Sequence, residues 1–79
     1  SMQRECGIFK AANNKWYLEL GNREHSGWDD CTIYGPFLSS DDATAELCNH
    51  SNPGSMCIDP SGNRKVPANV VPPGPEDGS

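Results

Sequence analysis

A short helix with clear ends constrains the fold of this chain more than any other feature. Ser39-Ser40-Asp41-Asp42 is typical of a helix start, because a serine N-cap accepts an amide hydrogen bond and carboxylates suit the positive end of the helix dipole. Asn52-Pro53-Gly54 prevents a much longer helix. Between these signals, Ala43, Leu47 and Cys48 form a narrow apolar stripe. The sequence therefore predicts one helix of about ten residues, and strands have to supply the rest of the core.

Two short apolar-rich runs before the helix predict a β-hairpin. Residues 5–11 and 15–20 are separated by Ala12-Asn13-Asn14, and asparagine tolerates the positive φ of a tight reversal. The second run alternates apolar and polar residues, which places its tryptophan and both leucines on the buried face. Tyr17 is then expected on the opposite, outer face.

Residues 31–37 alternate again and predict a third strand. At period two, Cys31, Ile33 and Phe37 are expected on the core face, which leaves Tyr34 on the outer face. The Gly-Pro pair within this segment is expected to end the strand near Tyr34, because proline has no amide hydrogen to donate.

Two short elements and a tail are expected after the helix. Residues 55–59 predict a strand that buries its methionine and isoleucine, and residues 59–63 predict a turn. An edge strand is expected at residues 64–66. Residues 67–79 hold four prolines among glycines and acids and are expected to form a disordered tail.

Together these elements predict one α+β domain over residues 2–66, followed by the disordered Pro/Gly/acidic tail at 67–79. The order β-β-β-α-β corresponds to a small antiparallel sheet of three to five strands, with one helix packed on one face. A chain of 79 residues has room for one such core.

Four cysteines, Cys6, Cys31, Cys48 and Cys57, leave three interpretations open. Each lies in a predicted element at a position compatible with the core, so buried reduced thiols are the preferred interpretation. Disulfides in a secreted module are one alternative. A zinc site formed by Cys31, Cys48, His50 and Cys57 is the other, although the chain lacks the Cys-x2–4-Cys knuckle of structural zinc sites. We expect no cofactor.

Acidic residues dominate the centre of the chain, whose net charge is −5. From Glu24 to Asn63 there are seven carboxylates but no Lys or Arg. Such a segment repels phosphate and attracts basic surfaces, so we expect a protein partner with a basic surface and no direct binding of nucleic acid. Ordinary solvated surface is the alternative interpretation of these acids.

Aromatic residues beside acids indicate where such a partner would dock. Trp28 lies next to Asp29 and Asp30, and a ring flanked by carboxylates suits an anchor for a basic partner. Trp28 could equally cover the edge of the core. The predicted partner-binding residues are Glu24, Trp28, Asp29, Asp30, Tyr34, Asp41, Asp42 and Glu46.

The sequence contains no recognisable nucleophile motif or phosphate-binding loop, so we expect a non-catalytic binding module and not an enzyme. It has no long apolar run, and we expect no membrane association. We further expect a monomer when the protein is free, located in the cytoplasm, with secretion as the alternative.

The chain has, in this order, a strand, Tyr34-Gly35-Pro36-Phe37, Ser39, an alanine-bearing helix, Pro53-Gly54 and a final strand. In the order of these parts it resembles small phage-encoded inhibitors of bacterial RNA polymerase. The likeness spans roughly residues 15–67. The resemblance implies an acidic domain that occupies a basic nucleic-acid path on a host enzyme, in the host cytoplasm. A secreted disulfide-stabilised module, or a regulatory or scaffolding domain unrelated to nucleic acid, are the alternatives.

Overall fold

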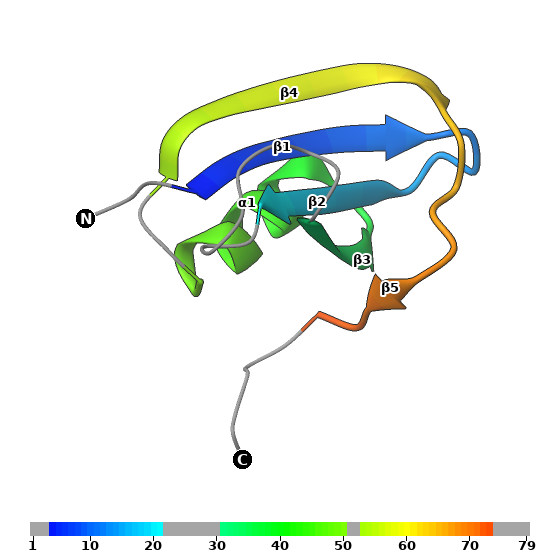
Figure 1. Cartoon of the computed structure of the whole chain (residues 1–79). Coiled ribbons are helices and arrows are strands. Elements are labelled where there is room, and N and C mark those ends of the chain that lie inside the picture. The colour runs from blue at the N-terminus through cyan, green and yellow to red at the C-terminus, as the bar shows by residue number, and fades with distance from the viewer. Residues whose placement is uncertain (1–3, 22–30, 51–52, 74–79) are drawn as a thin grey trace.

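A computed structural model describes residues 4–21, 31–50 and 53–73, which form a five-stranded sheet with one helix on one face (Figure 1). The elements in chain order are β1 (Arg4–Ala11), β2 (Trp16–Gly21), β3 (Cys31–Phe37), α1 (Ser40–Cys48), β4 (Pro53–Arg64) and β5 (Val70–Val71). The predicted α+β class with one helix over a small sheet is confirmed. In the described ranges, no helix has the length and apolar character needed to cross a membrane.

The sheet has the strand order β4-β1-β2-β3-β5 and is mixed. Strands β1, β2 and β3 form an antiparallel meander, whereas β4 pairs in parallel with β1 and β5 in parallel with β3. Parallel strands need a crossover connection. Helix α1 supplies it for β4 by carrying the chain from β3 back across β2 and β1. Both edge strands thus run parallel to their neighbours, where an antiparallel sheet was expected.

The β1–β2 hairpin forms where it was predicted. Asn14 adopts the positive φ of 66°, and its amide donates a hydrogen bond to the Ala11 carbonyl at 2.9 Å. The Asn13 side-chain oxygen accepts a further hydrogen bond from the Lys15 amide at 3.1 Å. These bonds satisfy the polar groups of the turn, and they hold the register in which Ile8 lies opposite Leu18.

Helix α1 begins as its sequence predicts. The Asp42 amide donates a hydrogen bond to the Ser39 Oγ at 3.1 Å, which satisfies one of the unpaired amides of the first turn. The helix ends at Cys48, with Asn49 as its C-cap. Ala43 and Leu47 face the sheet and are fully buried.

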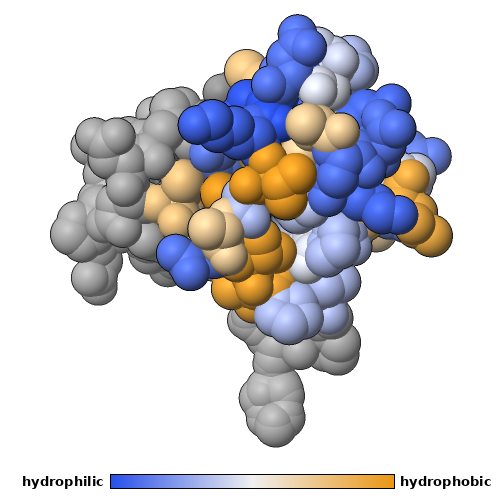
Figure 2. All heavy atoms as spheres, turned by 90° about the vertical axis from the view of Figure 1, so that its right-hand side faces the viewer, coloured by the Kyte–Doolittle hydropathy of each residue, from blue (hydrophilic) through white to orange (hydrophobic). Residues whose placement is uncertain are grey.

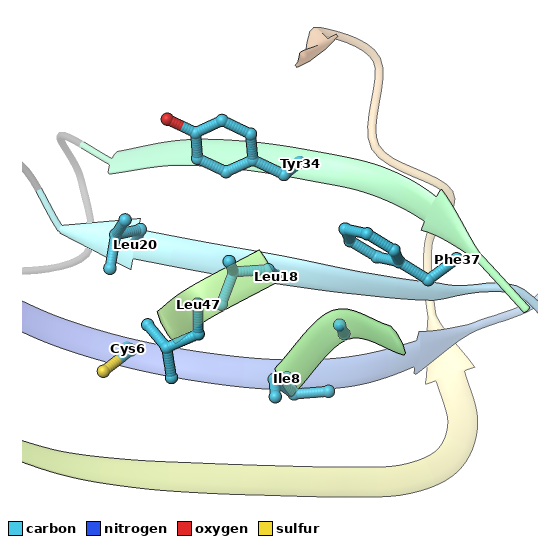
Figure 3. Packing of buried hydrophobic residues seen from close by; sticks show 8 residues of the cluster. Cys6, Ile8, Leu18, Leu20, Tyr34, Phe37 and Leu47 are labelled. Carbon is cyan, nitrogen blue, oxygen red and sulfur yellow. The ribbon is translucent and has the colours of Figure 1, made fainter. Parts of the chain in front are cut away.

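The main core lies between α1 and the sheet. Figure 3 shows side chains from β1, β2, β3 and α1 pointing toward one another in this layer. The buried members are Cys6, Ile8, Leu18, Leu20, Tyr34, Phe37, Ala43 and Leu47, with Trp16 packed at the margin. Burial of aliphatic side chains such as these contributes about 1.5–3 kcal/mol each, so this layer is the main source of stability.

A bulge in β3 changes which residues face this core. Tyr34 pairs with Leu18 and Phe37 pairs with Trp16, so three steps along β3 match two steps along β2. The extra residue is accommodated at Gly35-Pro36, where the glycine has a φ of +150°. Both Tyr34 and Phe37 consequently point toward α1, and the strand continues to Phe37 instead of ending near Tyr34.

The predicted faces of β3 were therefore wrong in part. Tyr34 is buried in the main core, whereas Ile33 lies on the opposite face of the sheet. The prediction counted every second residue through Gly35-Pro36, but a bulge shifts this alternation by one residue. Phe37 is in the core as predicted, and it is there together with Tyr34.

The face of the sheet opposite α1, called the open face below, carries a second cluster. Phe9, Ala11 and Tyr17 are buried there, with Ile33 and Val70 packed against them. The rings of Phe9 and Tyr17 stack with centroids 5.6 Å apart. Tyr17, expected to be exposed, is only 3% exposed because this face has a small core of its own.

The connection 65–69 carries the chain from β4 at one edge of the sheet to β5 at the other (Figure 1). Figure 2 shows this end of the molecule, where hydrophobic side chains lie among a mostly hydrophilic surface. Val70 and Val71 pair with Ile33 and Tyr34. The sheet thus includes two residues beyond the domain boundary expected at residue 66, while residues 74–79 lie outside the described part of the chain.

Strand β4 departs from prediction in length and in burial. It extends through the predicted turn at residues 59–63 up to Arg64, with an irregular register between Asp59 and Arg64. Met56 and Ile58, expected to be buried, are 38% and 50% exposed. They share a face with the main core, but α1 packs over β1, β2 and β3 and leaves β4 uncovered.

Candidate functional site

The described residues include half of the predicted partner-binding set. Glu24, Trp28, Asp29 and Asp30 lie outside the described residues. Of the other four, Asp41 and Asp42 are exposed on α1, whereas Tyr34 and Glu46 are buried.

Glu46 and Tyr34 belong to the interior, although both were expected on an exposed docking surface. Their role in partner binding stays a prediction. Glu46 is 6% exposed, and its Oε2 lies 2.8 Å from the Nε2 of His50, one helical turn further on. The His50 ring packs against the Tyr34 ring with centroids 4.5 Å apart. These three side chains connect the end of α1 to β3, because a buried carboxylate requires a polar partner.

The start of α1 forms an exposed surface of mixed character. Leu38, immediately before the N-cap, is 77% exposed, and Asp41 and Asp42 are exposed in the first turn. A residue at this position often packs against the fourth residue of the helix. Leu38 instead exposes most of its surface to water, in the same short segment as the two exposed carboxylates. We call Leu38, Asp41 and Asp42 the helix-start surface.

Sequence reasoning identified the two carboxylates of this surface but missed Leu38. A usable signal was present, since a leucine next to a serine N-cap lies outside the helix and its apolar stripe. Whether such a leucine packs inward depends on the path of the chain entering the helix. Here that path follows from the bulge in β3, which turns Phe37 inward and leaves Leu38 outward.

A hollow of about 310 Å³ lies on the open face, between β4 and the neighbouring strands β1 and β2. Its lining combines backbone, aromatic, thiol and charged groups. The lining residues are Gly7, Ile8, Phe9, Glu19, Cys57, Asp59 and Arg64.

Arg64 is the central side chain of this hollow. Its Cζ lies 3.9 Å from the centroid of the Phe9 ring, in a cation–π stack, and its Nη2 lies 3.5 Å from both carboxylate oxygens of Glu19. The Arg64 side chain is 44% exposed and the Glu19 side chain 15%. Arg64 therefore offsets the charge of Glu19 while one part of its surface stays in contact with water.

Asp59 adds a second carboxylate to the hollow. The Ser61 amide donates a hydrogen bond to its Oδ1 at 3.0 Å, and this bond holds the pKa of the Asp59 carboxyl below its usual value. The Arg64 guanidinium lowers the same pKa by a smaller amount. Asp59 is consequently ionised at neutral pH, and the hollow holds two carboxylates and one guanidinium.

The cysteines differ from one another in their surroundings. Cys6 is buried in the main core as predicted, Cys31 is half-buried with its Sγ 3.6 Å from the Glu19 Oε2, and Cys48 and Cys57 are exposed. All four lie in the described part of the chain, and none of them forms a disulfide. The expectation of four core thiols is thus correct for Cys6 and wrong for Cys48 and Cys57.

The alternative zinc site is not assembled. Cys31 lies on β3, Cys48 and His50 lie at the end of α1, and Cys57 lies on the outer strand β4. Among the residues that the structure describes, no three His, Cys, Asp or Glu side chains gather closely enough to hold a metal ion.

Comparisons with known proteins found no matching family model, no matching curated protein and no matching solved structure. The function of this chain has therefore to be inferred from its own residues. Two features of the described surface bear on it, namely the helix-start surface and the hollow on the open face.

Proposed function

We propose that this chain is a non-catalytic protein-binding module that docks its helix-start surface onto a basic surface of a partner protein. The observation that carries this proposal is the exposure of Leu38, at 77%, beside the exposed carboxylates of Asp41 and Asp42. An apolar side chain gains free energy when a partner removes it from water. Adjacent carboxylates orient that partner and select a basic one.

The charge of the surrounding chain supports the same proposal. No ion pair within the described residues involves Asp41 or Asp42, so both charges are available to a partner. The chain carries a net charge of −5, and no Lys or Arg occurs between Glu24 and Asn63. The resulting field speeds the approach of a basic protein and is screened by salt within about 8–10 Å at physiological ionic strength.

The finer form of the proposal is that the partner is an enzyme with a basic path for nucleic acid, such as a bacterial RNA polymerase, which this chain inhibits by occupying the path. The acidic centre of the chain and the order of elements from β3 to β4 support it. On this proposal the chain and a nucleic acid compete for the same basic residues of the enzyme.

The test uses purified bacterial RNA polymerase core enzyme as the probe. We expect the chain to bind at low salt, to be displaced by heparin or duplex DNA, and to bind several-fold more weakly at moderate salt. The variant Leu38→Ser with Asp41→Asn and Asp42→Asn should lose about tenfold or more in affinity. Asparagine has the same shape as aspartate, so these substitutions remove charge with little change in packing. Circular dichroism checks that the variant folds.

Asp59→Asn provides the matched control, because it removes one carboxylate from the open face and leaves the helix-start surface intact. It should bind as tightly as the unchanged chain. Binding that does not depend on salt concentration, or that is as tight in the triple variant, would contradict docking through the helix-start surface. Failure to bind the polymerase at any salt concentration would remove the polymerase from the proposal.

A further inference from the structure

The two edges of the sheet differ in length and in protection. Strand β5 closes one edge with two residues, whereas the other edge is β4, with twelve. Within the described residues, β4 pairs only with β1, and Figure 1 shows it as the outermost strand. Its outward backbone groups are therefore available for another strand.

Natural edge strands are protected by short length, by proline or by charge. Strand β4 has Pro53 and Pro60, but the stretch Ser55–Ile58 between them contains no charged residue and no proline. On the face of the main core, this stretch exposes Met56 and Ile58, at 38% and 50%. An uncharged and partly apolar stretch of an edge strand is suited to strand pairing.

We propose that β4 pairs antiparallel with β4 of a second copy of this chain, about a two-fold axis through Cys57. A two-fold axis perpendicular to the sheet joins the two sheets edge to edge and keeps both helices on the same side. In this register Met56 of each copy lies opposite Ile58 of the other. Each exposed apolar side chain thus acquires an apolar neighbour across the pair.

This register brings no two like charges into contact across the pair. Asp59, the charged residue nearest the axis, lies opposite residue 55 of the second copy, which is a serine. Like charges directly opposite one another would destabilise the pair. The self-complementary arrangement about Cys57 favours a second copy over a foreign strand, and it replaces the expectation of a free monomer.

Cys57 allows the position of the two-fold axis to be tested by disulfide formation. Residues directly opposite one another in an antiparallel pair have Cα atoms about 4.5–5.5 Å apart, and a disulfide requires about 4.4–6.8 Å. The two Cys57 thiols on the axis therefore come within bonding distance. Cys57 is exposed and lines the hollow on the open face, so a small oxidant has access to it.

The salt dependence of this pairing is opposite to that of the proposed docking. Two copies that each carry a net charge of −5 repel one another, and salt screens that repulsion. Self-association should consequently strengthen at moderate salt, whereas docking onto a basic partner should weaken. Failure of one proposal is thereby distinguishable from failure of the other.

The first experiment is sedimentation equilibrium of the full chain, with reductant, over a range of protein and salt concentrations. We expect a reversible monomer–dimer equilibrium that shifts toward dimer as salt rises. Ile58→Lys should raise the dissociation constant about tenfold or more, because it places a charge in the apolar pair. Leu38→Lys, which places a cation at an exposed aliphatic residue outside β4, is the control and should leave the dimer intact.

The second experiment tests the position of the axis. Diamide takes up two hydrogen atoms as two thiols join in a disulfide, so it reports thiols held close together. The Cys48→Ser variant, which keeps Cys57, should form a covalent dimer rapidly, and the Cys57→Ser variant, which keeps Cys48, should not. Monomer at every concentration and salt, a dimer indifferent to Ile58→Lys, or equal crosslinking of both serine variants would overturn the proposal.

Discussion

The two faces of the sheet are both partly buried, but by different kinds of group. On one face, aliphatic side chains such as Leu18 pack beneath α1 and exclude water completely. On the open face, the Phe9 ring stacks on Tyr17 and lies beneath the guanidinium of Arg64, whose side chain remains 44% exposed. Stability should therefore depend mainly on the helix-covered face, while the open face combines a smaller stabilising effect with chemical groups that a ligand can reach.

Truncation of one side chain on each face should give the largest difference in the free energy of unfolding. Leu18→Ala, at a fully buried site beneath α1, should lower the free energy of unfolding by about 3 kcal/mol. Ile33→Ala, at a half-buried site on the open face, should lower it by about 1 kcal/mol, because fewer buried contacts are lost. Urea unfolding measures both values, and equal losses would remove the distinction between the faces.

A substitution at the bulge in β3 should lower the free energy of unfolding nearly as much as Leu18→Ala. In Gly35→Ala, the new Cβ would lie 2.7 Å from the Cδ2 of Tyr17, at a φ of +150°. We expect a loss of about 2 kcal/mol, since both the backbone and the packed ring have to move. Gly62→Ala is the matched control, because its φ is also positive at +76° but its nearest contact is 3.9 Å.

That control should lose only about 1 kcal/mol, the cost of the left-handed conformation alone. Comparison of the two unfolding curves separates backbone conformation from the clash with Tyr17. A loss for Gly35→Ala no greater than that for Gly62→Ala would contradict close packing at the bulge.

A smaller effect is expected from the guanidinium on the open face. Arg64→Ala removes the stack on Phe9 and the contact with Glu19, and it should cost about 1 kcal/mol at low salt. Arg64→Lys keeps the charge but not the planar stack, so it should recover only part of this loss. Lys65→Ala, at the next exposed position, should change the unfolding midpoint very little, and equal effects at both positions would argue against the stack.

The smallest expected effect is on the stability of the fold at acidic pH. The pKa of Asp59 lies below its usual 3.8 in the folded chain, chiefly because of the Ser61 amide, so the folded state favours the ionised carboxylate. The resulting stabilisation is present above about pH 4 and is lost as the pH falls through the lower folded-state pKa. Carbon-detected NMR titration should give a midpoint below 3.8 for Asp59. Stability of Asp59→Asn should fall less steeply between about pH 4 and pH 2.

Local signals explain which parts of the fold were predictable. The N-cap at Ser39 and the turn at Asn14 depend on hydrogen bonds among residues a few positions apart, so the helix and the hairpin could be predicted from their sequences. The prediction assigned Ile33 to the wrong face of β3, because the alternation of apolar and polar residues does not reveal the bulge at Gly35-Pro36. Tyr34 was consequently placed on the wrong face.

Contacts between distant segments explain what sequence could not predict. The stack of Arg64 on Phe9 joins β4 to β1, and it depends on the parallel pairing that α1 makes possible. The exposure of Met56 depends in the same way on where α1 stops covering the sheet. For the candidate site, the exposed acids Asp41 and Asp42 were predicted, whereas Leu38 and the hollow became visible only in three dimensions.

The interior position of β1 has a consequence for biosynthesis. β1 emerges from the ribosome before the other four strands, yet it lies between β2 and β4 in the sheet. Its β2 side is covered as soon as the hairpin forms, but its other side stays open until the residues of β4, up to Arg64, have been made. The nascent hairpin is therefore exposed to other chains while β3, α1 and β4 are being made, and the sheet is completed only after synthesis of its outer strand.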